Sequence, residues 1–144
     1  MPATFIEKQN EIKAIFSNCL SEDDKYKKII ELGKKLEKIP SQYKIPENIV
    51  KGCQSTMYLH SFLKDGRVYF KIDSEALISA GLAAILLHVY NGESPETILT
   101  SAPLFLDELG ISASLTPSRA NGLYSVHLRM KQDALKFLTS KKTL

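Results

Sequence analysis

The chain has 144 residues, which is enough for one domain with a hydrophobic core, and no Pro/Gly/Ser-rich stretch divides it. The composition is 44% hydrophobic and 24% charged, as is typical of a globular protein, while the net charge of +3 is too small for a nucleic-acid-binding surface. The sequence lacks a recognisable secretory signal, and its longest apolar segment, residues 76–90, is shorter than the roughly 20 residues that span a bilayer. We therefore expect a single domain over residues 1–144, cytoplasmic, with neither nucleic acid nor membrane as a partner.

Two helices are predicted at the N-terminus. Apolar residues recur at helical spacing over residues 5–20, with charged residues on the opposite face. Ser21, followed by three acidic residues, is typical of a helix start, and we expect this second helix to continue to Pro40. Pro40 and Pro46 then favour an irregular segment over residues 39–50.

A β-hairpin and a buried helix should follow. Residues 56–63 and 68–72 read as strands, and Asp65-Gly66 between them is typical of a tight two-residue turn. Ser74 is a plausible N-cap for a helix over residues 75–90, which Asn91-Gly92 would close. This helix is apolar enough to occupy the centre of the fold.

The C-terminal third is predicted to be helical. Two short helices are expected between Ser94 and Gly110, separated by Pro103, and Thr116-Pro117 should start a long last helix. The order of elements indicates an α+β fold in which a small antiparallel β-sheet packs one face against several α-helices.

Cys53 is the residue that most strongly suggests chemistry. It lies in the tetrapeptide Gly52-Cys53-Gln54-Ser55, where Gly52 leaves room for an incoming group and the two polar residues can donate hydrogen bonds. A reactive cysteine needs access and a means to form its thiolate, since an ordinary thiol is mostly protonated at neutral pH. Lys51, Arg119 and backbone N–H groups could each stabilise that thiolate. The alternative is an incidental small residue at a strand start.

The other candidate residues favour structural roles. Cys19 falls on the apolar face of the first helix and is expected in the core. His60, His88 and His127 have no spacing that matches a catalytic base or a metal site, and we expect His88 to be a hydrogen-bonded core residue. Two cysteines and three histidines at these positions do not make a closed zinc site or an iron–sulfur scaffold, so no metal is expected.

Arg119 occupies the first turn of the last predicted helix, where the helix dipole disfavours a cation. We therefore expect its guanidinium to have a partner elsewhere, which could be an acidic residue, a loop carbonyl or the surface of another protein.

Three motifs occur in order along the chain: Gly52-Cys53-Gln54-Ser55, Ala76-x-Ile78-x-x-Gly81-Leu82-x-Ala84 and Leu115-Thr116-Pro117-Ser118-Arg119-x-x-Gly122. Together with the segment Ile30-Glu31-Leu32-Gly33, they resemble the SufE family of sulfur acceptors. The resemblance covers nearly the whole chain and implies a SufE/IscU-like fold.

The resemblance also implies a function in iron–sulfur cluster assembly by the SUF system. Cys53 would form a persulfide with sulfur from a pyridoxal-phosphate-dependent cysteine desulfurase of the SufS type. The sulfur would then pass to a SufB or SufBCD-type scaffold, and the protein would stimulate the desulfurase rather than act as a stand-alone enzyme. Gly52, Gln54, Ser55 and Arg119 would support Cys53, and the chain itself would need no cofactor.

Three other functions are compatible with the sequence. A paralogous carrier could serve another desulfurase and acceptor. A cysteine-dependent hydrolase would need a histidine close to Cys53, and an interaction module would leave the thiol inert. The chain also departs from the family pattern at Thr56-Met57-Tyr58 and at Glu75, which bears on the partner interface rather than on the thiol.

Overall fold

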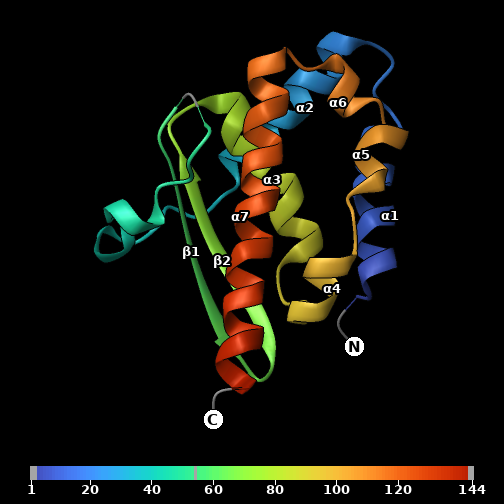
Figure 1. Ribbon diagram of the computed structural model, residues 1–144. Helices are drawn as coiled ribbons and strands as arrows, with labels where there is room; N and C mark the ends of the chain where they lie inside the picture. The colour runs from blue at the N-terminus through green and yellow to red at the C-terminus, as the bar shows by residue number, and fades with distance from the viewer. Residues whose placement is uncertain (1–2, 54, 143–144) are drawn as a thin grey trace.

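The computed structural model describes residues 3–53 and 55–142, and it is an α+β fold as the sequence predicts (Figure 1). In chain order the elements are α1 (Phe5–Phe16), α2 (Glu22–Lys34), the 3₁₀ turns η1 (Ser41–Tyr43) and η2 (Pro46–Asn48), β1 (Met57–Lys64), β2 (Arg67–Ser74), α3 (Leu77–Tyr90), α4 (Pro95–Thr100), α5 (Leu104–Glu108), α6 (Ile111–Ser114) and α7 (Pro117–Lys142). The hairpin forms one side of the molecule, α3 and α7 lie beside it, and the remaining helices lie beyond them (Figure 1). Within the described ranges, none of these helices is long and apolar enough to cross a membrane.

The second helix is shorter than the sequence indicated. It begins as expected, with the Ser21 hydroxyl accepting from the Asp24 N–H at 3.1 Å. It ends at Lys34 instead of continuing to Pro40. Gly33 has low helix propensity, and the carbonyls of Leu32 and Gly33 accept i+3 hydrogen bonds of 3.2 Å that tighten and close the last turn.

The hairpin has the predicted turn. The strands pair antiparallel from Met57 opposite Ser74 to Lys64 opposite Arg67, so two residues connect them. Those residues, Asp65 and Gly66, have φ of 52° and 77°, and this pair of positive φ values defines the turn type that matches the twist of a hairpin.

The two faces of the hairpin have different neighbours. The face towards α3 is buried and consists of Met57, Leu59, Val68, Phe70 and Ile72. On the other face, the His60 ring stacks on Tyr43 of η1 with centroids 3.9 Å apart, and Phe62 stacks on Tyr69 at 5.6 Å. The helices therefore pack on one face of the sheet, as predicted, while the 3₁₀ segment covers part of the other.

Helix α3 is the centre of the fold, and nine of its fourteen residues are buried. Its N-cap is Ala76 and not Ser74, so the predicted start was two residues early. Ser74 is instead the last residue of β2, where pairing with Met57 holds it extended, and its hydroxyl accepts from the Ala76 N–H at 3.3 Å.

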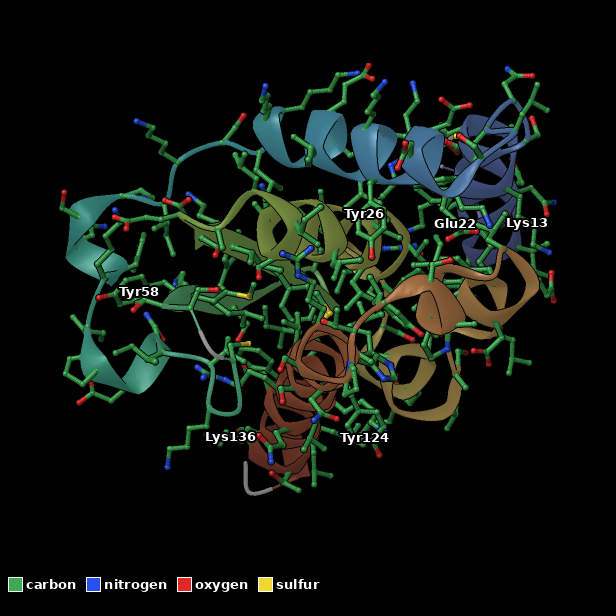
Figure 2. The ribbon with its side chains drawn as sticks, turned by 90° about the horizontal axis from the view of Figure 1, so that it is seen from above. Lys13, Glu22, Tyr26, Tyr58, Tyr124 and Lys136 are labelled. Carbon is green, nitrogen blue, oxygen red and sulfur yellow. The ribbon has the colours of Figure 1, made fainter. Side chains whose placement is uncertain are left out.

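The C-terminal third contains the two predicted short helices and one further turn, α6. The Tyr26 ring points from α2 into the molecule, and its hydroxyl donates to the Ser114 carbonyl at 2.8 Å, which joins α6 to α2 (Figure 2). Thr116 caps α7 through a 3.4 Å hydrogen bond from the Arg119 N–H. Tyr124 and Lys136 point outwards from that helix (Figure 2).

Two glycines allow α2 and α3 to pack in close contact. A Cβ at Gly81 would lie 2.0 Å from the Ile29 carbonyl oxygen, and a Cβ at Gly33 would lie 2.6 Å from the Gly81 nitrogen. Both contacts involve backbone atoms, which cannot move aside without displacing a helix. The separation of these helices therefore depends on the absence of two side chains.

Gly81→Ala is expected to lower the free energy of unfolding by about 3 kcal/mol, because the added methyl group forces α2 away from α3. Urea denaturation followed by circular dichroism measures this change. Gly122→Ala is the matched control, since among the described residues outside its own helix backbone its Cβ would approach the Cys53 Sγ alone, at an ordinary 3.9 Å. Equal destabilisation by both substitutions would contradict the proposed role of the glycine contact.

Candidate functional site

Cys53 lies at the tip of a short loop, residues 51–56, which we term the Cys53 loop. A hydrogen bond of 2.9 Å from the Val50 N–H to the Met57 carbonyl closes its base. Gly52 has a φ of +93°, and a Cβ at this position would lie 2.3 Å from the Ser125 Oγ of α7. Glycine is therefore required here both by backbone conformation and by the close approach of α7.

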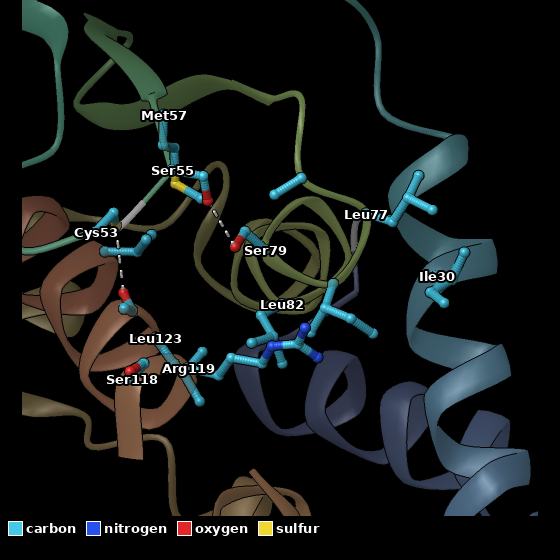
Figure 3. A pocket seen from close by; sticks show the side chains of 14 residues that line it. Ile30, Cys53, Ser55, Met57, Leu77, Ser79, Leu82, Ser118, Arg119 and Leu123 are labelled. Carbon is cyan, nitrogen blue, oxygen red and sulfur yellow. Dashed lines mark hydrogen bonds between the residues drawn. The ribbon is translucent and has the colours of Figure 1, made fainter. Parts of the chain in front are cut away.

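The loop forms one wall of a cavity of about 510 Å³ (Figure 3). The motifs that are separate in sequence meet at this cavity, since the start of α3 and the first turns of α7 provide its other walls and α2 contributes Ile30. The lining residues are Ile30, Cys53, Ser55, Met57, Ala76, Leu77, Ile78, Ser79, Leu82, Ser118, Arg119, Gly122, Leu123 and Val126.

The Cys53 thiol is partly buried and faces α7. Its Sγ lies 3.8 Å from the Gly122 carbonyl oxygen, to which the S–H donates. Burial raises the pKa of this thiol above its ordinary value near 9.0, and it is the single cause found within the described residues. Neither Lys51 nor Arg119 contributes to this shift. The resting form at neutral pH is the protonated thiol.

Ser55 is a polar residue of the Cys53 loop that contacts α3. The Ser55 hydroxyl lies 3.4 Å from the Ser79 hydroxyl across the cavity (Figure 3), which links the loop to α3. Gln54 was predicted to support the thiol, but it lies outside the described residues. Ser79 was not singled out from the sequence, because a serine among apolar helix residues gives no indication of which loop it faces.

Arg119 reaches from the first turn of α7 across the cavity (Figure 3). The residue is exposed, and over the described part of the chain its guanidinium makes no hydrogen bond or ion pair. Of the three partners expected from sequence, neither an acidic residue nor a loop carbonyl contacts the guanidinium among the described residues. The guanidinium at the mouth of the cavity is available to a bound molecule or protein.

None of the three histidines lines the cavity. His60 lies on the outer face of the hairpin against Tyr43, and His127 is buried on α7 beside Tyr90. His88 was expected in the core, but it is exposed, and its Nε2 lies 3.2 Å from a carboxylate oxygen of Glu11 on α1. The α1–α3 packing turns this side chain to the surface, which helical periodicity within an apolar run does not reveal.

Helix α1 ends at Phe16 and not at residue 20, so the prediction that Cys19 lies on the first helix was wrong. Cys19 follows that helix and is partly buried against the hydrophobic core, where it was expected. Among the residues that the structure describes, no group of three histidine, cysteine and carboxylate side chains could hold a metal ion.

Alkylation of Cys53 in a Cys19→Ser background should have a pH midpoint above 9, because burial favours the protonated thiol. Unfolding in urea should lower this midpoint, since the thiol is then hydrated and the thiolate forms at lower pH. The measurement is the iodoacetamide reaction rate against pH, with and without urea. A folded midpoint at or below the unfolded one would overturn the description of a sheltered thiol.

Comparison with known proteins identifies relatives over most of the chain. The profile of the SufE family, described as an Fe–S metabolism associated domain, matches residues 10–134. An uncharacterized SufE-like protein of Synechocystis sp. is 40% identical over 113 residues, which make up 78% of this chain and 71% of that protein. SufE-like protein 1, chloroplastic/mitochondrial, of Arabidopsis thaliana is 36% identical over 129 residues, or 89% of this chain. These residues are 35% of the plant protein, so the chain spans about a third of its length.

A solved structure shares the fold. The solution structure of a hypothetical protein from Thermus thermophilus superimposes with a TM-score of 0.75 and 25% identity, covering 92% of this chain and 96% of that one. The family profile matches residues 10–134, and two relatives are 36% and 40% identical, so the chain belongs to the SufE family, whose domain is associated with iron–sulfur metabolism.

Proposed function

We propose that this protein is a sulfur acceptor that carries a persulfide on Cys53. The observation that carries the proposal is the placement of Cys53, on a loop whose thiol faces a cavity formed by all three sequence motifs. In the transfer step, the Cys53 thiolate attacks the outer sulfur of a cysteine persulfide on the donor protein. The donor S–S bond breaks, its cysteine leaves as a thiolate, and a new S–S bond forms on Cys53. The reaction is a thiol–disulfide type exchange with no net oxidation.

The shelter of Cys53 suits a carrier. A persulfide that faces the cavity is kept from the thiols of a reducing compartment such as the cytoplasm, where we place the protein. The same burial raises the pKa of Cys53, so that attack requires deprotonation. We propose that docking of the donor draws the Cys53 loop out of the cavity, which hydrates the thiol and lowers its pKa. The acceptor would thus react fast only when a partner is bound.

The partners follow from this chemistry and from family membership. The donor is a SufS-like cysteine desulfurase, which keeps its own pyridoxal phosphate, and turnover is stimulated because its persulfide is removed. The recipient is a SufB or SufBCD-type scaffold for iron–sulfur clusters. The acceptor chain needs no cofactor for these steps, since a single thiol performs both transfers.

A cysteine-dependent hydrolase is the less favoured function. Such an enzyme needs a base within hydrogen-bonding reach of the thiol, and the three histidines lie outside the cavity lining. A paralogous carrier for another desulfurase would use the same Cys53 chemistry and differ in its partner surface.

Incubation with a SufS-like desulfurase and free cysteine, without reductant, should add one or more sulfur atoms to the protein, as read by intact mass. Cys53→Ser should gain no sulfur, whereas Cys19→Ser should gain as much as the wild type. Sulfur on Cys53→Ser would place the acceptor elsewhere. Failure of the wild type to gain sulfur from a desulfurase that is turning over would refute the carrier function with that donor.

Arg119→Met should leave the free energy of unfolding within about 0.5 kcal/mol of the wild type, because an exposed side chain with no hydrogen bond or ion pair to the described residues contributes little to stability. We expect the same substitution to weaken desulfurase binding about tenfold, the effect of removing one charge-assisted contact. Calorimetric titration measures the affinity, and Lys64→Met on the far end of the hairpin is the control. Unchanged affinity would exclude Arg119 from the interface.

A further inference from the structure

Arg129 occupies a position on α7 that the sequence motifs do not include. Its Nε donates to both carboxylate oxygens of Asp133 one turn later, at 3.1 and 3.3 Å. Its side chain is 18% exposed and that of Asp133 is 8% exposed, so both charges are largely removed from water. A buried carboxylate requires hydrogen bonds from its surroundings, and Asp133 also accepts from the Ser61 hydroxyl at 2.7 Å.

The rest of the guanidinium contacts backbone on both sides of the Cys53 loop. Before the loop, its Nη2 donates to the Glu47 carbonyl at 2.9 Å and its Nη1 to the Ile49 carbonyl at 3.3 Å. After the loop, Nη2 also donates to the Leu59 carbonyl at 3.4 Å. The Arg129 side chain therefore connects α7 to the chain segment before the Cys53 loop and to the segment after it.

We propose that Arg129 is the positioning residue of the Cys53 loop. It fixes the segments before and after the loop on α7, so that Cys53 is held opposite Gly122 on the same helix. The Val50–Met57 hydrogen bond and the Arg129 contacts lie just outside the loop and limit its movement from both sides. That Arg129 helps to shelter a persulfide on Cys53 rests on the proposed function. That Arg129 positions the Cys53 thiol does not.

The geometry requires arginine rather than any cation. A guanidinium is planar, with N–H groups directed along several edges, and can contact a carboxylate and three carbonyls together. A lysine ammonium is a compact group on a flexible chain and would retain only part of this set. Arg129→Lys should therefore hold the Cys53 loop only partly in place. A residue that merely supplied positive charge could be replaced by lysine without this loss.

The test is the alkylation of both cysteines in one chain by iodoacetamide, followed by peptide mass spectrometry. In Arg129→Met the rate at Cys53 should rise about tenfold, the effect expected from losing a charge-assisted hydrogen bond. The rate at Cys19, which is remote from the loop on the α1 side, should not change. The pH midpoint at Cys53 should also fall, because the released thiol is better hydrated. The charged groups beside it, Arg119 lining the cavity and Lys51 in the loop, remain in every variant.

Arg67→Met is the matched control. Arg67 also donates to a backbone carbonyl, that of Gly92 at 2.9 Å, but it lies at the far end of the hairpin from Cys53. In this control, the alkylation rates at Cys19 and Cys53 should equal those of the wild type. If Arg129→Met does not fold, Arg129→Lys should give an intermediate rise at Cys53 alone.

An equal rise at Cys19 and Cys53 would mean general loosening of the fold and would overturn the proposal, as would an unchanged Cys53 rate in folded Arg129→Met. These measurements use no desulfurase. A protein whose Arg129 controls Cys53 alkylation but which gains no sulfur from a desulfurase would refute the carrier function and retain the positioning role.

Discussion

The close approach of α2 and α3 is the constraint on which the site depends. Gly33 and Gly81 allow backbone to meet backbone, and any side chain at either position would separate the helices. This contact sets Ile30 of α2 beside Ile78 and the other α3 residues in one cavity wall. The wall opposite Cys53 is therefore formed by helix packing rather than by a dedicated loop.

Helix α7 provides the other half of the site, and it does so with residues spaced over successive turns. Gly122 accepts the Cys53 S–H, Ser125 lies against Gly52, and Arg129 binds the carbonyls that flank the loop. The thiol is thereby held in a protonated and sheltered form. Sulfur transfer needs the opposite properties, an exposed thiolate, so the proposed carrier must change state when its partner binds. In the proposed mechanism, the short loop between its fixed ends provides that change without disturbing the core.

Much of the fold could be predicted because its signals are local. The Asp65-Gly66 turn, the Ser21 cap and the Thr116-Pro117 helix start each depend on neighbouring residues, and the structure has all three. Two of the errors arose where tertiary contacts prevailed. Ser74 stayed in β2 because pairing with Met57 holds it there, and His88 is turned to the surface by the packing of α3 on α1.

The sequence of this protein determines its family and identifies Cys53 as the proposed reactive residue, because three ordered motifs and a cysteine beside a glycine can be recognised without coordinates. It also contains one unused signal: Asp133 continues the apolar spacing of Leu123, Val126 and Met130, and a carboxylate on a buried stripe needs a partner. The identity of that partner network, the cavity and the raised pKa of Cys53 depend on which distant segments meet. Those properties arise from burial and from contacts between residues up to 82 positions apart, which local patterns do not encode.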